Sequence, residues 1–382
     1  MATLNVGPGQ EDSTITDAVN AANGGDTISV QAGTYNEDSI QVSKSLNFEA
    51  AGGQVDVQPA NGQIAGDKGL FVVGDGSSAP DVTFNGFAFE NASGPSGNDA
   101  GIRVESGNVT IDNSLFQNDQ IGLLATPLQP GTGTVSISDS EFTGNGAAAN
   151  GSLNHSLYVN EISSLTVDGS YFHGDQSAGE TIKSRADNTT ITSTRVDDRG
   201  TPANYEIGIP NGGNATISGD TLAKGADAGN HTMIAFGAEG DRSPSSDSLT
   251  VNGNTLIDEG SNGTAVWNAT SAIAQISNNS LNGITTLSNG PDNPLGNVFI
   301  SAEPTVDTTL PWQAAVNDPS NQPAPSVGSP MPSGGSTSSG GSIPDPTPAA
   351  ASASMPFGSG IGPSHYAPLS HTDGFHYTPT SA

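Results

Sequence analysis

A short sequence pattern recurs eight times between residues 82 and 281, and it constrains the fold more than any other feature of the chain. Each copy opens with three residues, of which the middle one is polar and the outer two are apolar, apart from Thr189. The third residue of each copy serves as its anchor, and successive anchors lie 24 to 34 residues apart. They are Phe84, Ile111, Ile137, Val167, Ile191, Ile217, Val251 and Ile276.

Two further positions of the repeat are fixed relative to each anchor. Two residues beyond it stands a small or polar residue that suits a tight turn, because Gly, Asn and Asp tolerate left-handed backbone. These residues are Gly86, Asn113, Asp139, Gly169, Ser193, Gly219, Gly253 and Asn278. Five residues beyond each anchor stands an apolar residue, and the set is Phe89, Phe116, Phe142, Phe172, Val196, Leu222, Leu256 and Leu281.

Together these positions predict a coil made of a strand, a tight turn and a second strand. Side chains alternate between the two faces of a strand, so one face of each coil is apolar. A single coil cannot bury that face, but coils stacked about 4.8 Å apart form a continuous core. The sequence therefore predicts an all-β solenoid, a parallel β-helix. The apolar residues five positions beyond the anchors should lie above one another in successive coils and form an apolar ladder. An antiparallel sandwich, the structural alternative, does not predict one repeated register with an aligned aromatic stack.

The two ends of the chain differ from the repeat. Apolar residues at helical spacing follow Ser13 and Thr14, either of which can cap a helix. We expect a short helix there that covers the open first coil. The stretch after Trp312 is rich in Pro, Ser and Gly and too poor in apolar residues to fold alone. The expected organisation is an N-terminal cap over 1–24, a β-helix over 25–313 and a disordered tail over 314–382.

The charge balance excludes several classes of partner. The chain has 9 Lys and Arg against 39 Asp and Glu, for a formal net charge of −30. Such a surface repels phosphate backbones and anionic lipids, so nucleic acid is not an expected partner. An acidic polymer can bind only at a local basic patch or through a bound cation. No run of about eighteen apolar residues occurs, so we expect no membrane span.

Basic residues are scarce, yet four of the nine fall between positions 183 and 199: Lys183, Arg185, Arg195 and Arg199. Lys183 and Arg185 are two residues apart in a predicted strand, so their side chains point to the same face, roughly 7 Å apart. One interpretation is structural, an ion-pair cluster that offsets the nearby acids Asp187, Asp197 and Asp198.

Alignment of successive coils places other polar side chains beside this pair. Tyr158, Lys183 and Glu206 are expected in one outward column. Further contacts to a ligand are expected from residues next to these strands, namely Asn160 beside Arg185, and His155 and His173 at the border of the patch.

These residue types suit chemistry on a uronic-acid polysaccharide. Removal of the acidic C5 proton of a uronate needs a cation on the carboxylate and a base beside C5. Arg185 suits the first role through its planar fork. Lys183 suits the second if Arg185 lowers the pKa of its amine by like-charge repulsion. Tyr158 could protonate the leaving glycosidic oxygen. Glu206 works against a neutral Lys183 by favouring its charged form, unless Glu206 instead holds a metal or Arg185.

The coils resemble the pectate-lyase-like superfamily of right-handed parallel β-helices over roughly residues 3–312. The resemblance is carried by the opening stretch, Gly7–Gln10 through Gly25–Ile28 and Ala32–Tyr35. It implies a right-handed coil, and the superfamily includes lyases, hydrolases, esterases, epimerases and adhesins. A Lys and Arg pair near a carboxylate is similar to the alginate-lyase and chondroitinase-B-like branch, although that branch places base and acid on neighbouring coils. No set of acids matches calcium ligands residue by residue, so Ca²⁺ is an optional cofactor at most.

Two functions remain open. The first is a lyase or C5-epimerase acting on uronic-acid polysaccharide, favoured by the basic patch. The second is a non-catalytic glycan-binding or adhesin-like solenoid, favoured by the long tail and the acidic, threonine-rich coils. A hydrolase would need two carboxylates flanking the scissile bond, and only Glu206 is expected on this face. Either main function suits a secreted or cell-surface monomer, although Met1–Val6 does not read as a secretory signal peptide.

Overall fold

A computed structural model of the protein describes residues 1–64, 66, 68–147, 153–242 and 245–312. The described part is nearly all β, with parallel strands throughout and one helix, α1 (Ile15–Ala21). None of the described segments forms a helix with the length and apolarity that crossing a bilayer requires. The tail expected over 314–382 lies outside the described residues.

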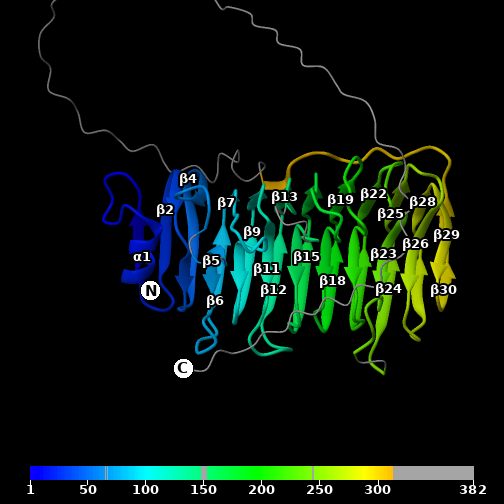
Figure 1. Ribbon diagram of the computed structural model, residues 1–382, viewed down its shortest axis with the longest axis horizontal. Helices are drawn as coiled ribbons and strands as arrows, with labels where there is room; N and C mark the ends of the chain where they lie inside the picture. The colour runs from blue at the N-terminus through cyan, green and yellow to red at the C-terminus, as the bar shows by residue number, and fades with distance from the viewer. Residues whose placement is uncertain (65, 67, 148–152, 243–244, 313–382) are drawn as a thin grey trace, which may run out of the picture. The chain divides into compact units, whose positions relative to one another are not determined.

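The strands form two stacks, and each strand pairs with its equivalents in the coils on either side (Figure 1). The larger sheet receives two strands from each regular coil. Its strands are β1 (Thr3–Val6), β2 (Thr27–Glu37), β4 (Leu46–Pro59), β6 (Asp81–Asn85), β7 (Phe87–Glu90), β9 (Asn108–Asp112), β10 (Leu115–Gln117), β12 (Thr134–Ser138), β13 (Glu141–Thr143), β15 (Ser164–Asp168), β16 (Tyr171–His173), β18 (Asn188–Thr192), β19 (Arg195–Asp198), β21 (Asn214–Ser218), β22 (Thr221–Lys224), β24 (Ser248–Asn252), β25 (Thr255–Asp258), β27 (Ala274–Ser277), β28 (Ser280–Asn282), β30 (Asp292–Leu295) and β31 (Val298–Phe299).

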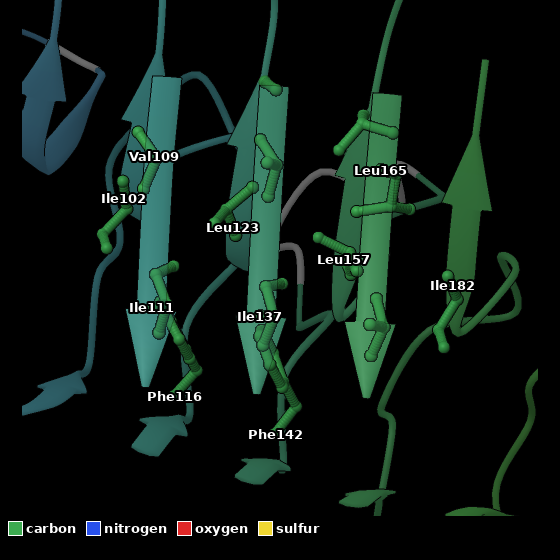
Figure 2. Close-up of a cluster of buried hydrophobic side chains, with 14 of the residues drawn as sticks. Ile102, Val109, Ile111, Phe116, Leu123, Ile137, Phe142, Leu157, Leu165 and Ile182 are labelled. Atoms are coloured by element: carbon green, nitrogen blue, oxygen red, sulfur yellow. The ribbon is translucent and has the colours of Figure 1, made fainter. Parts of the chain in front are cut away.

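The smaller sheet receives one strand from each coil and carries the predicted patch. Its strands are β3 (Ile40–Val42), β5 (Gly69–Val73), β8 (Ala100–Val104), β11 (Ile121–Ala125), β14 (Leu157–Val159), β17 (Ile182–Ser184), β20 (Ile207–Ile209), β23 (Thr232–Phe236), β26 (Gly263–Asn268) and β29 (Ile284–Asn289). Apolar side chains from both sheets fill the space between them, as Figure 2 shows for Ile111 and Ile137 opposite Leu123 and Leu157.

The turn predicted two residues beyond each anchor is confirmed. All eight residues at this position have positive φ, from 45° at Asp139 to 80° at Gly86. Left-handed backbone is costly for most residues, which explains why only Gly, Asn, Asp and Ser occur there. The turn therefore follows from local backbone sterics and fixes the angle between the two strands of the larger sheet.

The apolar ladder five residues beyond each anchor is also confirmed. Phe89, Phe116, Phe142 and Phe172 pair in register on successive strands. The rings of Phe116 and Phe142 stack with centroids 4.4 Å apart, and those of Phe142 and Phe172 do the same. The ladder continues through aliphatic residues and ends at Phe299, which pairs with Leu281 and is 62% exposed because no described coil covers it.

The first coil is covered as the sequence predicts. Thr14 caps α1, with its hydroxyl oxygen accepting a hydrogen bond from the backbone N–H of Asp17 at 3.1 Å. Ile15, Ala18 and Val19 form the buried face of the helix and join the core. The backbone N–H of Ile15 also donates to Glu37, which ties the start of α1 to β2.

A polar ladder runs beside the apolar one and gives a prediction on pH. Asp220 takes the position that Asn254 holds in the next coil. The side-chain oxygen of each accepts a hydrogen bond from a backbone N–H of the preceding coil, that of Thr194 for Asp220 and that of Asp220 for Asn254. Asp220 is 1% exposed, and burial raises the pKa of its carboxyl from 3.8 to about 8. Because the folded state holds this proton more tightly than the unfolded state, the associated stability is present below about pH 4 and is lost as the pH rises through about 8.

Asp220→Asn is therefore expected to leave the melting temperature unchanged near pH 4 and to raise it relative to the wild type above about pH 8. The reciprocal change Asn254→Asp should place a buried carboxyl in the next coil and give the same loss of stability as the pH rises. Thermal melts of the three proteins between these pH values test the point. A constant difference between wild type and Asp220→Asn at every pH would contradict the assignment.

Candidate functional site

The predicted patch lies on the outer face of the smaller sheet. Tyr158 pairs in register with Lys183, one coil apart, so their side chains share the expected outward column. Arg185 lies two residues beyond Lys183, just after β17, and its backbone N–H bonds to the carbonyl of Val159. Asn160 follows Val159 and so lies beside Arg185 on the neighbouring coil. The repeat therefore brings a phenol, an ammonium and a guanidinium together.

Lys183 is held between two carboxylates. Its Nζ lies 3.0 Å from Glu239 Oε1 and 3.6 Å from Glu180 Oε2. It also lies 5.6 Å from the centroid of the Tyr158 ring, within reach of a cation–π contact. The residue is only 5% exposed, so its ammonium is nearly covered by these partners.

Arg185 joins the phenol to a neighbouring loop. Its Nε donates to Tyr158 Oη at 3.0 Å, while its two terminal nitrogens contact Asn211 Oδ1 and Glu239 Oε2. Arg242 bonds to the backbone carbonyl of Arg185. The guanidinium is thus oriented by three different side chains. We call Tyr158, Glu180, Lys183, Arg185, Asn211 and Glu239 the Lys183–Arg185 site.

His155 borders the site as expected. Its ring lies edge-on to Tyr158, with centroids 5.1 Å apart, and Nδ1 lies 2.7 Å from the carbonyl oxygen of Glu180. A carbonyl can only accept, so Nδ1 carries the proton and Nε2 does not. Burial lowers the pKa of His155 more than the nearby Glu180 carboxylate raises it, and the imidazole is neutral at pH 7.

The condition under which Lys183 would act as a base, an amine pKa lowered by Arg185, is not met. Burial alone would lower the pKa of its amine, but the carboxylates of Glu180 and Glu239 outweigh burial and the pKa is raised. Lys183 is therefore an ammonium ion at neutral pH and not a ready base. The like-charge repulsion expected from Arg185 fails because Glu239 contacts both cations and screens one from the other.

The expected position of Glu206 is also wrong. Lys183 pairs with Gly208, not with Glu206, so the outward column continues through a glycine. Glu206 precedes β20 and is fully buried, with Oε1 2.9 Å from Nζ of the equally buried Lys224. A buried ammonium needs a counter-charge, and Glu206 turns inward at the start of the strand to supply it. Burial raises the pKa of Glu206, and the neighbouring Lys224 ammonium opposes that rise.

His173 does not border the site either. It lies on β16 in the larger sheet, where Nε2 is 2.9 Å from Glu141 Oε1 and the ring stacks on Tyr171. Glu141 also accepts a hydrogen bond from the indole of Trp312. The segment containing Trp312 returns along this sheet after β31 (orange in Figure 1), and Arg195 bonds to its backbone at Asp307 and Thr309. His173 and Arg195 therefore help to hold this segment.

Three members of the site were missed in the sequence: Glu180, Asn211 and Glu239. Glu180 precedes β17 and stands three residues before Lys183, an odd spacing that strand alternation would place on the opposite face. Asn211 and Glu239 come from loops after β20 and β23, and the repeat says nothing about where loop side chains point. Within the described ranges, no three or more His, Cys, Asp or Glu side chains are grouped to hold a metal ion.

Comparison with known proteins identifies the fold. No protein-family model matches the sequence, and no curated protein matches it by sequence. Among solved structures, an alginate lyase from Paenibacillus sp. str. FPU-7 is 15% identical, with a TM-score of 0.51 over 77% of this chain and 99% of that one. The ORF18 protein of Geobacillus virus E2 is 14% identical, with a TM-score of 0.53 over 78% of this chain, which spans 62% of the virus protein. These likenesses confirm the parallel β-helix fold that the sequence predicts.

Proposed function

We propose that the protein acts outside the cell on a uronic-acid polysaccharide, as a lyase or C5-epimerase, at the Lys183–Arg185 site. The observation that carries this proposal is the convergence of Lys183, Arg185 and Tyr158 on one outward face of an otherwise strongly acidic chain. Two cations fixed within one site are what a polyanionic ligand needs. The alginate lyase with the same fold supports the substrate class by analogy only.

The contacts suggest a role for each group. Arg185 and Asn211 would hold the uronate carboxylate, and the Lys183 ammonium would stabilise the negative charge that develops there as C5 loses its proton. The neutral His155, with Nε2 unprotonated, is the candidate base for that proton. Tyr158 Oη accepts from Arg185, so its own proton is available for the glycosidic oxygen. Return of a proton to the opposite face of C5 would instead give epimerisation.

A non-catalytic glycan-binding solenoid is the second candidate function. The observation that favours it is Glu239, which neutralises Lys183 and Arg185 together and leaves neither as an open electrophilic group. In that case the site would recognise an acidic sugar without transforming it.

The two functions are separated by incubating the protein with a panel of uronate polymers. Ultraviolet absorbance of the unsaturated product reports a lyase, and NMR of the recovered polymer reports inversion at C5. His155→Gln and Tyr158→Phe should abolish either activity and keep binding. Binding without turnover on every polymer would favour the second function, and no binding to any acidic polymer would overturn both.

Glu239 offers a direct test of the carboxylate position. Because Glu239 contacts both cations from an exposed loop position, we expect it to occupy the place of the substrate carboxylate. Glu239→Gln should remove this internal competitor and tighten binding of a uronate oligosaccharide roughly tenfold, or about 1.4 kcal/mol. Isothermal titration calorimetry measures the change.

Glu161→Gln is the matched control, because Glu161 pairs at 2.7 Å with Arg242, whose side chain bonds to the backbone carbonyl of Arg185 and not to its guanidinium. It should leave the affinity unchanged. Weaker binding in Glu239→Gln, with an unchanged melting temperature, would show instead that Glu239 positions the two cations for the ligand.

A further inference from the structure

Two aromatic side chains stand on the same face of the smaller sheet as the Lys183–Arg185 site. Trp267 lies on β26 and Tyr205 lies just before β20, and their ring centroids are 6.3 Å apart. The chain has only two tryptophans. Trp312 is 9% exposed and its indole N–H bonds to Glu141, whereas Trp267 is 36% exposed.

Register connects this pair of rings to the cations. Lys183 pairs with Gly208, Gly208 with Ala235, and Ala235 with Trp267. Trp267 therefore belongs to the outward column of Tyr158 and Lys183, three strand spacings or roughly 14 Å beyond Lys183. Between Lys183 and Trp267 the column carries only the hydrogen of Gly208 and the methyl group of Ala235. The Glu180 side chain lies over Gly208, because a Cβ built on Gly208 would come within 2.7 Å of Glu180 Cγ.

We propose that Tyr205 and Trp267 form a stacking subsite for a pyranose ring of the polysaccharide whose uronate carboxylate binds at Lys183 and Arg185. This inference rests on the proposed function and adds a direction to it: the polymer runs along the stacking direction of the coils, across β17, β20, β23 and β26. The C–H face of a pyranose is apolar and its edge is hydroxylated, so it suits a flat, amphipathic aromatic surface. Aromatics make up only 5% of the residues, so an exposed tryptophan aligned with the cationic pair is a specific feature.

The proposal predicts a dependence on chain length. An oligosaccharide too short to reach from Lys183 to Trp267 gains nothing from the subsite, whereas a longer one touches both. Trp267→Ala should therefore weaken binding of long uronate oligosaccharides roughly three- to tenfold and leave the shortest binding oligomer unaffected. Trp267→Phe should restore most of the affinity, since it keeps a flat ring.

The experiment is a calorimetric titration of wild type, Trp267→Ala and Trp267→Phe with uronate oligomers of increasing length. Ile273→Ala is the matched control, because Ile273 is a 60% exposed apolar residue between β26 and β27 that lies outside the column. Equal affinities of wild type and Trp267→Ala for every length would overturn the subsite alone. An equal loss at every length would also overturn it, since Trp267 would then act through the Lys183–Arg185 site. Absence of binding by the wild type would overturn the proposed function together with the subsite.

Discussion

Replacing Phe142 by alanine is expected to lower the free energy of unfolding by about 3–5 kcal/mol. Phe142 is fully buried, and its ring stacks at 4.4 Å on Phe116 in the preceding coil and on Phe172 in the following one. The rigid strands on both sides cannot close around the vacated volume, so the loss of apolar burial is joined by the cost of a cavity. Chemical denaturation followed by circular dichroism measures the change.

Phe299→Ala is the matched control for this prediction. Phe299 belongs to the same ladder through Leu281, but it is 62% exposed because no described coil lies beyond it. The same substitution there should cost about 1 kcal/mol or less. Equal losses for the two variants would mean that the stability of the fold does not come from stacking of one coil on the next.

The second large effect is expected at the cations. If the protein is a lyase or epimerase, Lys183→Ala and Arg185→Lys should each lower kcat/KM by a factor of about 10²–10⁴. Arg185→Lys keeps the positive charge but loses the planar fork that contacts Tyr158, Asn211 and Glu239 at once. Steady-state kinetics on the polymer that gives turnover measures both effects.

Lys68→Ala separates local chemistry from overall charge. The Lys68 side chain is 45% exposed and pairs with Glu105 at 2.7 Å, outside the Lys183–Arg185 site. Its replacement by alanine changes the net charge by the same amount as Lys183→Ala. We expect its kcat/KM to stay within about twofold of the wild type at moderate ionic strength. A fall as large as that of Lys183→Ala would indicate long-range attraction of the polymer rather than a defined site.

The sequence predicted most of the fold because the repeat is set by local physics. Gly, Asn and Asp mark the left-handed turn, and alternation of polar and apolar residues marks the inward face of each strand. Both rules hold for Asp139 and Phe142 as for their equivalents in other coils. The same alternation placed Tyr158 and Lys183 in one column correctly.

The site was predicted only where it lies within strands. Glu206 stands before β20, where alternation no longer applies, and the need of the buried Lys224 for a counter-charge decides its direction. Glu239 reaches Lys183 from a loop 56 residues further along the chain, and no local pattern signals that contact. The raised pKa of Lys183 could not be predicted for the same reason, because the pattern of the strands reveals neither of the two carboxylates that raise it.

The central proposal is that Lys183 and Arg185 bind the carboxylate of an acidic sugar. Calorimetric titration of the wild type and of Arg185→Gln, with a uronate oligosaccharide and with a neutral oligosaccharide of the same length, examines that binding without requiring turnover. We expect the wild type to bind the uronate oligomer at least tenfold more tightly than the neutral one, a difference of about 1.4 kcal/mol, and Arg185→Gln to lose this preference while keeping its melting temperature. Equal binding of the two sugars by the wild type, or an undiminished preference in Arg185→Gln, would show that the two cations do not recognise a sugar carboxylate.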